Sequence, residues 1–280
     1  MLLELGSHRF DVTHRAVVMG ILNRTPDSFF DGGAYAELDA FLAHAEQLVA
    51  DGADALDVGG VKAGPGPEVG EAEELDRVIP AIEALTARFD VPLACDTWRA
   101  SVAAAAFKAG AVVGNDISGF ADPEYLTVAA EAGASVVATH IRLAPRVADP
   151  TPHYDDLVGE VLAFLTDRAA RAEAAGIPRT RIMVDAGLDL GKTEAQSLEL
   201  LRASDRLAGL GYVAYLSASN KRFLGHLLDL EVGDRREATH AAHALGIIGG
   251  CRVLRAHDVR GSRRTRDVIA ALLAAQEEQS

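Results

Sequence analysis

Short apolar segments alternate with longer amphipathic segments along almost the whole chain. The apolar segments are nearly continuous, which is typical of parallel strands covered on both faces. The Ala- and Leu-rich segments between them have helical spacing, and several end in a glycine suited to a left-handed C-cap. The clearest helical segments are 37–52, 71–89 and 154–176, and the glycines are Gly52, Gly110, Gly133 and Gly176. The expected strands are 17–23, 55–60, 92–97, 112–117, 135–141, 182–187, 213–219 and 251–258.

Eight strand–helix units in 280 residues predict a closed α/β barrel, the (β/α)8 TIM barrel, as a single domain over 1–280. The competing fold is an open doubly wound sheet, but the Gly-rich fingerprint that usually follows its first strand is absent from the sequence. Pro80 is expected to kink the second long helix or divide it in two. The polar ending 274–280 is expected to be a flexible tail.

The acidic composition narrows the classes of partner. The formal net charge is −14, from 27 Lys and Arg against 41 Asp and Glu, which argues against a nucleic acid or an anionic membrane. Cys95 and Cys251 lie within apolar segments, so buried thiols in a reducing compartment are expected rather than a disulfide. Because acid and histidine come too early for a signal peptide and no apolar run is long enough to span a membrane, we expect a cytoplasmic protein.

Every expected strand ends in at least one polar side chain. Catalytic groups of TIM barrels lie at the carboxyl ends of strands and in the loops that follow, so this recurrence predicts a site there. A helix cap or a loop contact explains any single member, and Asp57, before two glycines, is expected to have such a structural role. The residues are Asn23, Asp57, Asp96, Asn115, His140, Asp185, Ser217, Ser219, Arg255 and His257.

Cations gather at the last two strand ends. Arg255 and His257 are two residues apart and so point to the same face, and Lys221 shares parity with Ser217 and Ser219 if the extended backbone continues. The loops after strands seven and eight commonly bind phosphate in this fold, so an anionic group on the ligand is expected. The alternative for Arg255 is a structural salt bridge in the barrel mouth.

The third, fourth and sixth strand ends carry hydrogen-bond acceptors instead. Asp96, Asn115 and Asp185 would suit a donor-rich heterocycle, because a carboxylate can accept two hydrogen bonds from an amino-pyrimidinone edge. Divalent metal binding or strand-end capping remains the alternative for the two aspartates. His240 and His243 are expected to face solvent, and "GLDLGKT" (187–193) lacks the spacing of a phosphate-binding P-loop.

Seven segments together resemble the dihydropteroate synthase family. They are "MGILNRTPDSFFDGG", "DVGGVKAGPG", "CDTWRA", "GNDISG", "MVDAGLDLGKT", "SASNKRFLG" and "LRAHDV", and they occur in the family's order at the expected strand ends. The resemblance covers nearly the whole chain. It implies the same (β/α)8 barrel, usually as a homodimer.

The resemblance implies a reaction of folate biosynthesis. The family joins 4-aminobenzoate to 6-hydroxymethyl-7,8-dihydropterin diphosphate and releases diphosphate. By this resemblance Asp96, Asn115, Asp185 and Lys221 would hold the pterin, and Asn23, Arg255 and His257 the diphosphate. Catalytic roles would fall to Asn23, Lys221 and Arg255, with Mg²⁺ at Asn23. The loop after the first strand, with Phe29 and Phe30, and the second loop 61–69 would close over the site.

Departures from the family pattern lie on the aminobenzoate side. The family has Glu-Ser-Thr-Arg where this chain has Val61-Lys62-Ala63-Gly64, and Ser-Arg-Lys-Ser where it has Ser219-Asn220-Lys221-Arg222. Lys62, Arg222 and Arg24 could serve the aminobenzoate carboxylate by a different geometry. Such changes also resemble a divergent actinobacterial second copy.

The sequence therefore leaves three candidate functions. The first is the synthase reaction with 4-aminobenzoate. The second is a pterin-binding paralogue with weak or no synthase activity, or with a different acceptor. The third, a methyltetrahydrofolate:corrinoid methyltransferase, is disfavoured because that branch has no diphosphate to hold.

Overall fold

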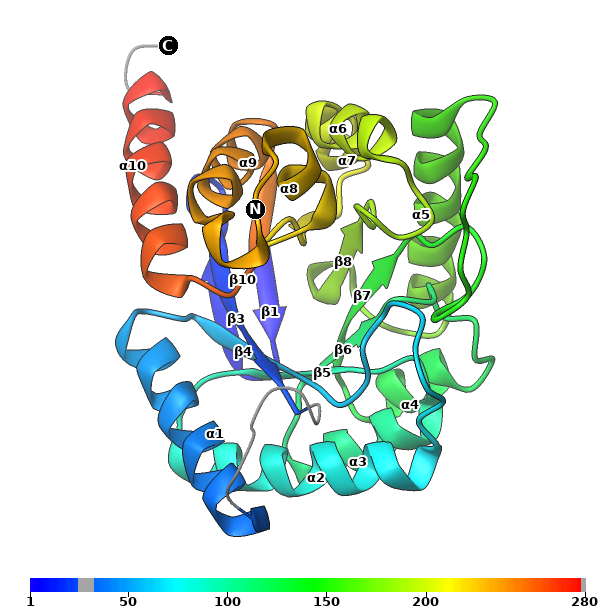
Figure 1. Cartoon of the computed structure of the whole chain (residues 1–280), viewed down its shortest axis with the longest axis vertical. Coiled ribbons are helices and arrows are strands. Elements are labelled where there is room, and N and C mark those ends of the chain that lie inside the picture. The colour runs from blue at the N-terminus through cyan, green and yellow to red at the C-terminus, as the bar shows by residue number, and fades with distance from the viewer. Residues whose placement is uncertain (25–32, 278–280) are drawn as a thin grey trace.

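Eight parallel strands close into a barrel, as the sequence predicts. The computed structural model describes residues 1–24 and 33–277. The barrel strands are β3 (Val17–Asn23), β4 (Ala55–Gly59), β5 (Leu93–Asp96), β6 (Val113–Asp116), β7 (Ser135–Thr139), β8 (Ile182–Asp185), β9 (Val213–Leu216) and β10 (Cys251–Ala256). They pair in the order β10-β3-β4-β5-β6-β7-β8-β9 (Figure 1). Several strands stop before the last polar residue of the expected segment, so His140, Ser217 and His257 lie just beyond the ladder.

The helices surround the barrel and return the chain to its opposite end. They are α1 (Gly33–Ala50), α2 (Glu71–Arg88), α3 (Ala100–Ala109), α4 (Tyr125–Glu131), α5 (Leu157–Ala174), α6 (Glu194–Arg202), α7 (Ser204–Ala208), α8 (Arg222–Leu228), α9 (Arg236–Ile248) and α10 (Val259–Glu277), with 3-10 turns η2 (Arg179–Arg181) and η3 (Val232–Asp234). The helix α2 is continuous through Pro80, so of the two outcomes predicted for this proline, a kink or a division, the division does not occur. The helix α10 extends to Glu277, so it includes the first four residues of the predicted tail 274–280, and the rest lie outside the described residues.

The glycine predicted to cap the third helix shows why that residue type is needed. Gly110 has φ +116° and its N–H bonds to carbonyls in the last turn of α3. A Cβ here would lie 2.4 Å from Thr86 Oγ1, so both the backbone conformation and the space exclude other residues. Gly52, Gly133 and Gly176 also have positive φ, which confirms the left-handed conformation predicted for these glycines.

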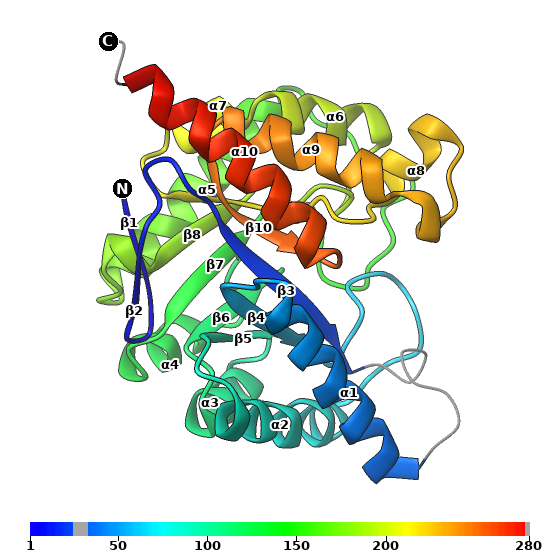
Figure 2. The ribbon, with the colours of Figure 1, turned by 90° about the vertical axis from the view of Figure 1, so that its left-hand side faces the viewer.

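Two apolar layers hold the barrel together. One fills the barrel, with fully buried Met19, Ala94 and Met183 among its members, and the other lies between strands and helices. The inner layer continues into an amino-terminal hairpin of β1 (Leu2–Leu5) and β2 (His8–Asp11), which the sequence analysis did not predict. Leu3 and Leu5 are fully buried, each worth about 1.5–3 kcal/mol by transfer from water. Figure 2 shows the hairpin on the side of the barrel away from the loop between β4 and α2, so the other end remains for a site.

The described part of the chain contains no helix long and apolar enough to cross a membrane. Cys95 and Cys251 are both buried free thiols, as expected.

Candidate active site

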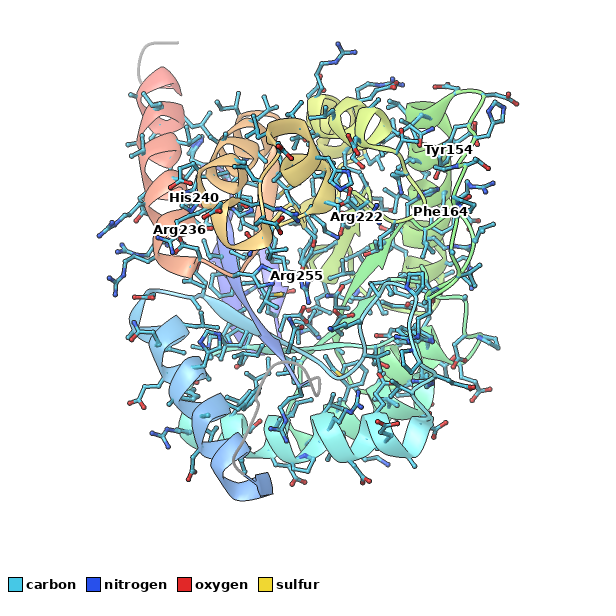
Figure 3. The ribbon with its side chains drawn as sticks, viewed as in Figure 1. Tyr154, Phe164, Arg222, Arg236, His240 and Arg255 are labelled. Atoms are coloured by element: carbon cyan, nitrogen blue, oxygen red, sulfur yellow. The ribbon has the colours of Figure 1, made fainter. Side chains whose placement is uncertain are left out.

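Four polar side chains from four strands form one network at the carboxyl end of the barrel. Arg255 donates from Nε to Asp57 Oδ2 at 2.5 Å and from Nη2 to Asp96 Oδ2 at 2.9 Å. Asn115 Nδ2 donates to the same Asp57 oxygen at 3.1 Å. Asp57 is fully buried, and Figure 3 shows Arg255 in the middle of the barrel mouth. The salt bridge considered for Arg255 is therefore present, and Asp57 has a structural role in orienting Arg255 and Asn115.

Burial shifts the charges of this network. Burial raises the pKa of Asp96 to about 7, although the adjacent Arg255 opposes the shift. Burial by itself would lower the pKa of Arg255, but the carboxylates of Asp57 and Asp96 raise it above its ordinary value. Arg255 is thus a fixed cation, whereas Asp96 can accept or donate a hydrogen bond near neutral pH. This dual character suits a heterocycle that presents both donors and acceptors.

Buried Asp185 and half-buried Lys221 complete the polar groups of the mouth. Asp185 is buried at the end of β8, where Oδ1 accepts the Gly187 N–H at 2.9 Å, and burial raises its pKa. Lys221 is the residue before α8. Burial lowers the pKa of Lys221, while the carboxylates of Asp189 and Asp185 act in the opposite direction. The structure therefore brings Lys221 into the electrostatic neighbourhood of the carboxyl groups that the sequence singled out.

His257 is held by Ser219, which lies in the segment after β9. Its Nδ1 lies 2.9 Å from Ser219 Oγ, which also accepts the His257 N–H at 3.1 Å. Partial desolvation and the charges of Arg255 and Lys221 lower the pKa of His257, although the residue remains exposed. At neutral pH His257 is therefore a hydrogen-bonding group, and the expected anion site depends on Arg255 and Lys221 for its charge.

Asn23 lies at the end of β3, exposed and opposite Gly59 in the strand register. The next residue, Arg24, has its guanidinium 5.4 Å from the centre of the Phe41 ring on α1. Among residues 1–24 and 33–277, no group of three or more His, Cys, Asp or Glu side chains is placed to hold a metal ion. The predicted first lid, including Phe29 and Phe30, lies outside the described residues.

A cavity of about 660 Å³ lies among the loops that follow β4, β7, β8 and β9. Arg222 lines this cavity, and Figure 3 places it near the start of α8. Lys62 is exposed and is not part of the lining, so Lys62 and Arg222, two of the three side chains considered for the aminobenzoate carboxylate, are not brought together here. Other lining residues are Pro65, Arg146, Asp149, Asp189, Leu190 and His226.

Asp189 is a site residue that the sequence analysis missed. It has φ +66°, lines the cavity, and accepts the Arg222 N–H at 2.5 Å and the Phe223 N–H at 3.3 Å. A protein carboxylate thus occupies the first amides of α8. The signal was an aspartate within "GLDLG", because Asp tolerates the left-handed conformation and caps helices.

Lys192 is a second residue whose role was missed. Its buried Nζ lies 3.0 Å from His140 Nδ1 and donates to the carbonyls of Gly187, Leu190 and His140 at 2.9, 3.0 and 3.2 Å. Burial lowers the pKa of Lys192 to about 7, and burial lowers the pKa of His140 to about 3. Lys192 thereby fixes the loop that carries Asp189.

The prediction that His240 and His243 face solvent is wrong. His243 is fully buried, with Nδ1 3.1 Å from Ser262 Oγ, because α10 packs over this face of α9. His240 is largely covered and lies 3.2 Å from Asp258 Oδ2. Figure 3 shows His240 and Arg236 on the α10 side of the mouth.

The mouth of this parallel barrel combines buried carboxyl groups, an amide and two cations. Comparison with known proteins identifies the class to which such a barrel belongs. The family model described as pterin binding enzyme matches residues 19–257. Most of the chain is therefore a pterin-binding barrel. Within that class, the chain belongs to the dihydropteroate synthase family.

An active and an inactive relative are equally similar to this chain in sequence identity. The chain is 42% identical over 261 residues to dihydropteroate synthase of Bacillus subtilis, covering 92% of this chain and 89% of that one. It is also 42% identical over 264 residues to inactive dihydropteroate synthase 2 of Mycobacterium leprae, covering 92% and 91%. The solved structure of the Xanthomonas albilineans enzyme with 4-aminobenzoic acid has a TM-score of 0.89 and 39% identity, covering 98% of each chain.

Proposed function

We propose that this protein transfers a pterinylmethyl group from 6-hydroxymethyl-7,8-dihydropterin diphosphate to 4-aminobenzoate. The bond between the pterin methylene carbon and the diphosphate oxygen breaks, and a bond from that carbon to the aryl amine nitrogen forms. The amine loses a proton and diphosphate leaves. The products are 7,8-dihydropteroate and diphosphate.

The observation that carries this proposal is the Arg255 network with its two carboxyl partners. Asp96, Asn115 and Asp185 offer acceptors and donors to the edge of the pterin. The carboxyl group of Asp96 can serve a ring nitrogen in either protonation state because burial raises its pKa to about 7. Lys221 would contact the pterin carbonyl and approach the diphosphate.

Loss of diphosphate requires stabilisation of the developing negative charge. Arg255 is a fixed cation whose orientation Asp57 and Asp96 hold before a ligand binds, so little reorganisation is needed. Asn23 and His257 would donate or accept hydrogen bonds at the diphosphate. Among residues 1–24 and 33–277, Asn23 would fit Mg²⁺ as one oxygen ligand, because this ion is commonly held by few protein ligands and fills its shell with substrate phosphates and water. The bound ion would supply further charge neutralisation.

A second candidate function has its own support. Asp189 places a carboxylate at the first amides of α8, inside the cavity that would receive 4-aminobenzoate. That charge disfavours a carboxylate-bearing acceptor, while Arg222 in the same lining favours one. A pterin-binding paralogue with another amine acceptor, or with no synthase activity, is the alternative, and inactive relatives are as similar as active ones.

We further propose a cytoplasmic homodimer. Exposed apolar side chains on α9 and α10 support an interface there, since these helices pack side by side on the outside of the barrel (Figure 2). The residues are Leu245, Ile248, Val268 and Leu272.

The test is direct. Purified protein is mixed with Mg²⁺ and the pterin diphosphate, with and without 4-aminobenzoate, and dihydropteroate and diphosphate are measured by mass spectrometry. Production of dihydropteroate that depends on 4-aminobenzoate supports the synthase reaction. Tight binding of the pterin diphosphate without dihydropteroate supports the paralogue.

A further inference from the structure

Arginines from other segments hold the loop between β4 and α2. Near one end, Arg77 of α2 donates from Nη1 to the Gly60 carbonyl at 2.7 Å. Near the other end, Arg99 donates from Nη2 to the Val69 carbonyl at 2.7 Å. The intervening residues form neither helix nor strand, so their carbonyls need partners from elsewhere or from water. Both ends of this loop are thus fixed to the barrel rim.

Arg146 fixes the middle of the same loop. It lies between β7 and α5, has φ +66°, and donates from Nη1 to the Lys62 carbonyl at 2.9 Å. Its Nη2 donates to the Pro67 carbonyl, and its backbone N–H donates to the Ala63 carbonyl at 3.1 Å. One residue therefore makes three hydrogen bonds to the backbone of a segment 79 to 84 positions away in sequence.

The loop is shaped to accept this side chain. A Cβ built on Gly66 would lie 3.1 Å from Arg146 Nη2, tighter than an ordinary contact. A larger residue at that position would press on the guanidinium. The absence of a side chain at Gly66 and the left-handed backbone at Arg146 together allow the close approach.

The two segments that Arg146 joins are walls of the same cavity. Ala63, Gly64 and Pro65 line it from the loop after β4, and the residues from Arg146 to Pro150 line it from the segment after β7. Figure 1 shows these two segments approaching each other across the barrel mouth. The Arg255 network is built instead from strand ends and does not use Arg146.

We propose that Arg146 is a positioning residue that ties loop 60–70 to segment 141–153 and so forms the cavity for the second substrate. Binding of the pterin diphosphate does not depend on this tie. The assignment of the cavity to the second substrate rests on the proposed function, whereas the tie itself does not. A glutamine at position 146 keeps a polar side chain but cannot reach both carbonyls.

The tie can be tested by limited proteolysis of the full chain, because Lys62 provides a trypsin site within the loop. Cleavage after Lys62 requires local opening, so Arg146→Gln should accelerate appearance of the fragment 1–62 at least about tenfold, as expected for loss of charge-assisted hydrogen bonds. Arg142→Gln is the matched control, because Arg142 pairs with Asp149 within its own segment. Wild-type cleavage rates in Arg146→Gln would overturn the proposal.

Kinetics then test the assignment to the second substrate. In Arg146→Gln we expect the KM for 4-aminobenzoate to rise about tenfold, with the KM for the pterin diphosphate and kcat changed less than about twofold. Arg146→Lys can still reach one carbonyl, so its KM for 4-aminobenzoate should lie between those of the wild type and Arg146→Gln. An equal rise in both KM values would overturn the independence of the pterin site. If the wild type makes no dihydropteroate, the proposed function fails, and the proteolysis still decides whether the tie exists.

Discussion

The two sides of the barrel mouth hold their polar groups by different means. On the side of β4, β5, β6 and β10, side chains at strand ends pair directly with one another, as in the contacts of Arg255 with Asp57 and Asp96. On the side of β7, β8 and β9, single side chains bind the backbone of loops, as Lys192 and Arg146 do. The first arrangement fixes charge where the rigid ladder already determines position. The second shapes a cavity from segments that have no ladder of their own, so its form depends on a few distant side chains.

This comparison predicts its largest effect at Arg255. Arg255→Met would leave Asp57 buried without its counter-ion and beside Asp96, which should lower the free energy of unfolding by about 3–5 kcal/mol and abolish binding of the pterin diphosphate. Urea unfolding and calorimetric titration measure the two effects. Arg88→Met, which removes an exposed pair with Glu46, is the control and should cost at most about 1 kcal/mol. Equal losses in both variants would mean that the Arg255 network contributes no more than a surface ion pair.

On the same strand-end side, substitution of Lys221 is expected to change ligand affinity without lowering stability. Lys221→Ala should weaken binding of the pterin diphosphate by about a hundredfold or more, because a half-buried cation facing an anionic ligand is removed. Stability should change little or increase, since burial lowers the pKa of Lys221 and its charge is costly in the free protein. Lys108→Ala, on the exposed side of α3, is the matched control for titration calorimetry. Unchanged affinity in Lys221→Ala would contradict its assignment to the pterin site.

On the loop side, Lys192 predicts a pH dependence. Its pKa is lowered to about 7 by burial, so the unfolded chain binds more protons between pH 7 and its ordinary value of 10.5. Its contribution to stability is therefore fully present above about pH 10.5 and is lost progressively as pH falls from there to about 7, with a slope of up to about 1.4 kcal/mol per pH unit. Lys192→Met should flatten the rise in unfolding free energy between pH 7 and 10, measured by urea unfolding. A rise as steep as that of the wild type would show that other groups cause it.

The sequence predicts the strand-end side well and the loop side poorly, for a physical reason. Parity and strand order place Asp96, Asn115 and Arg255 together because the barrel repeats a fixed geometry. The tie from Arg146 to loop 60–70 joins segments about eighty residues apart through backbone carbonyls, which carry no residue-specific pattern. The hairpin before β3 escaped prediction because Leu3 and Leu5 form too short an apolar pattern.

Substitution of Asp189 is expected to have the smallest effect, and this effect bears most directly on the choice of acceptor. Asp189→Asn retains a helix-capping side chain but removes a negative charge from the cavity. The free energy of unfolding should therefore fall by no more than about 1 kcal/mol. Affinity for 4-aminobenzoate should improve about fivefold, because a screened like-charge repulsion of about 1 kcal/mol is relieved. Affinity for the pterin diphosphate is the internal comparison and should change less than affinity for 4-aminobenzoate, since Asp189 caps α8 outside the Arg255 network and acts on the pterin side only through its charge on Lys221. Weaker binding of 4-aminobenzoate in the variant would instead mean that the carboxylate supports the acceptor by holding Arg222 in place, and the cavity would then suit a carboxylate-bearing amine after all.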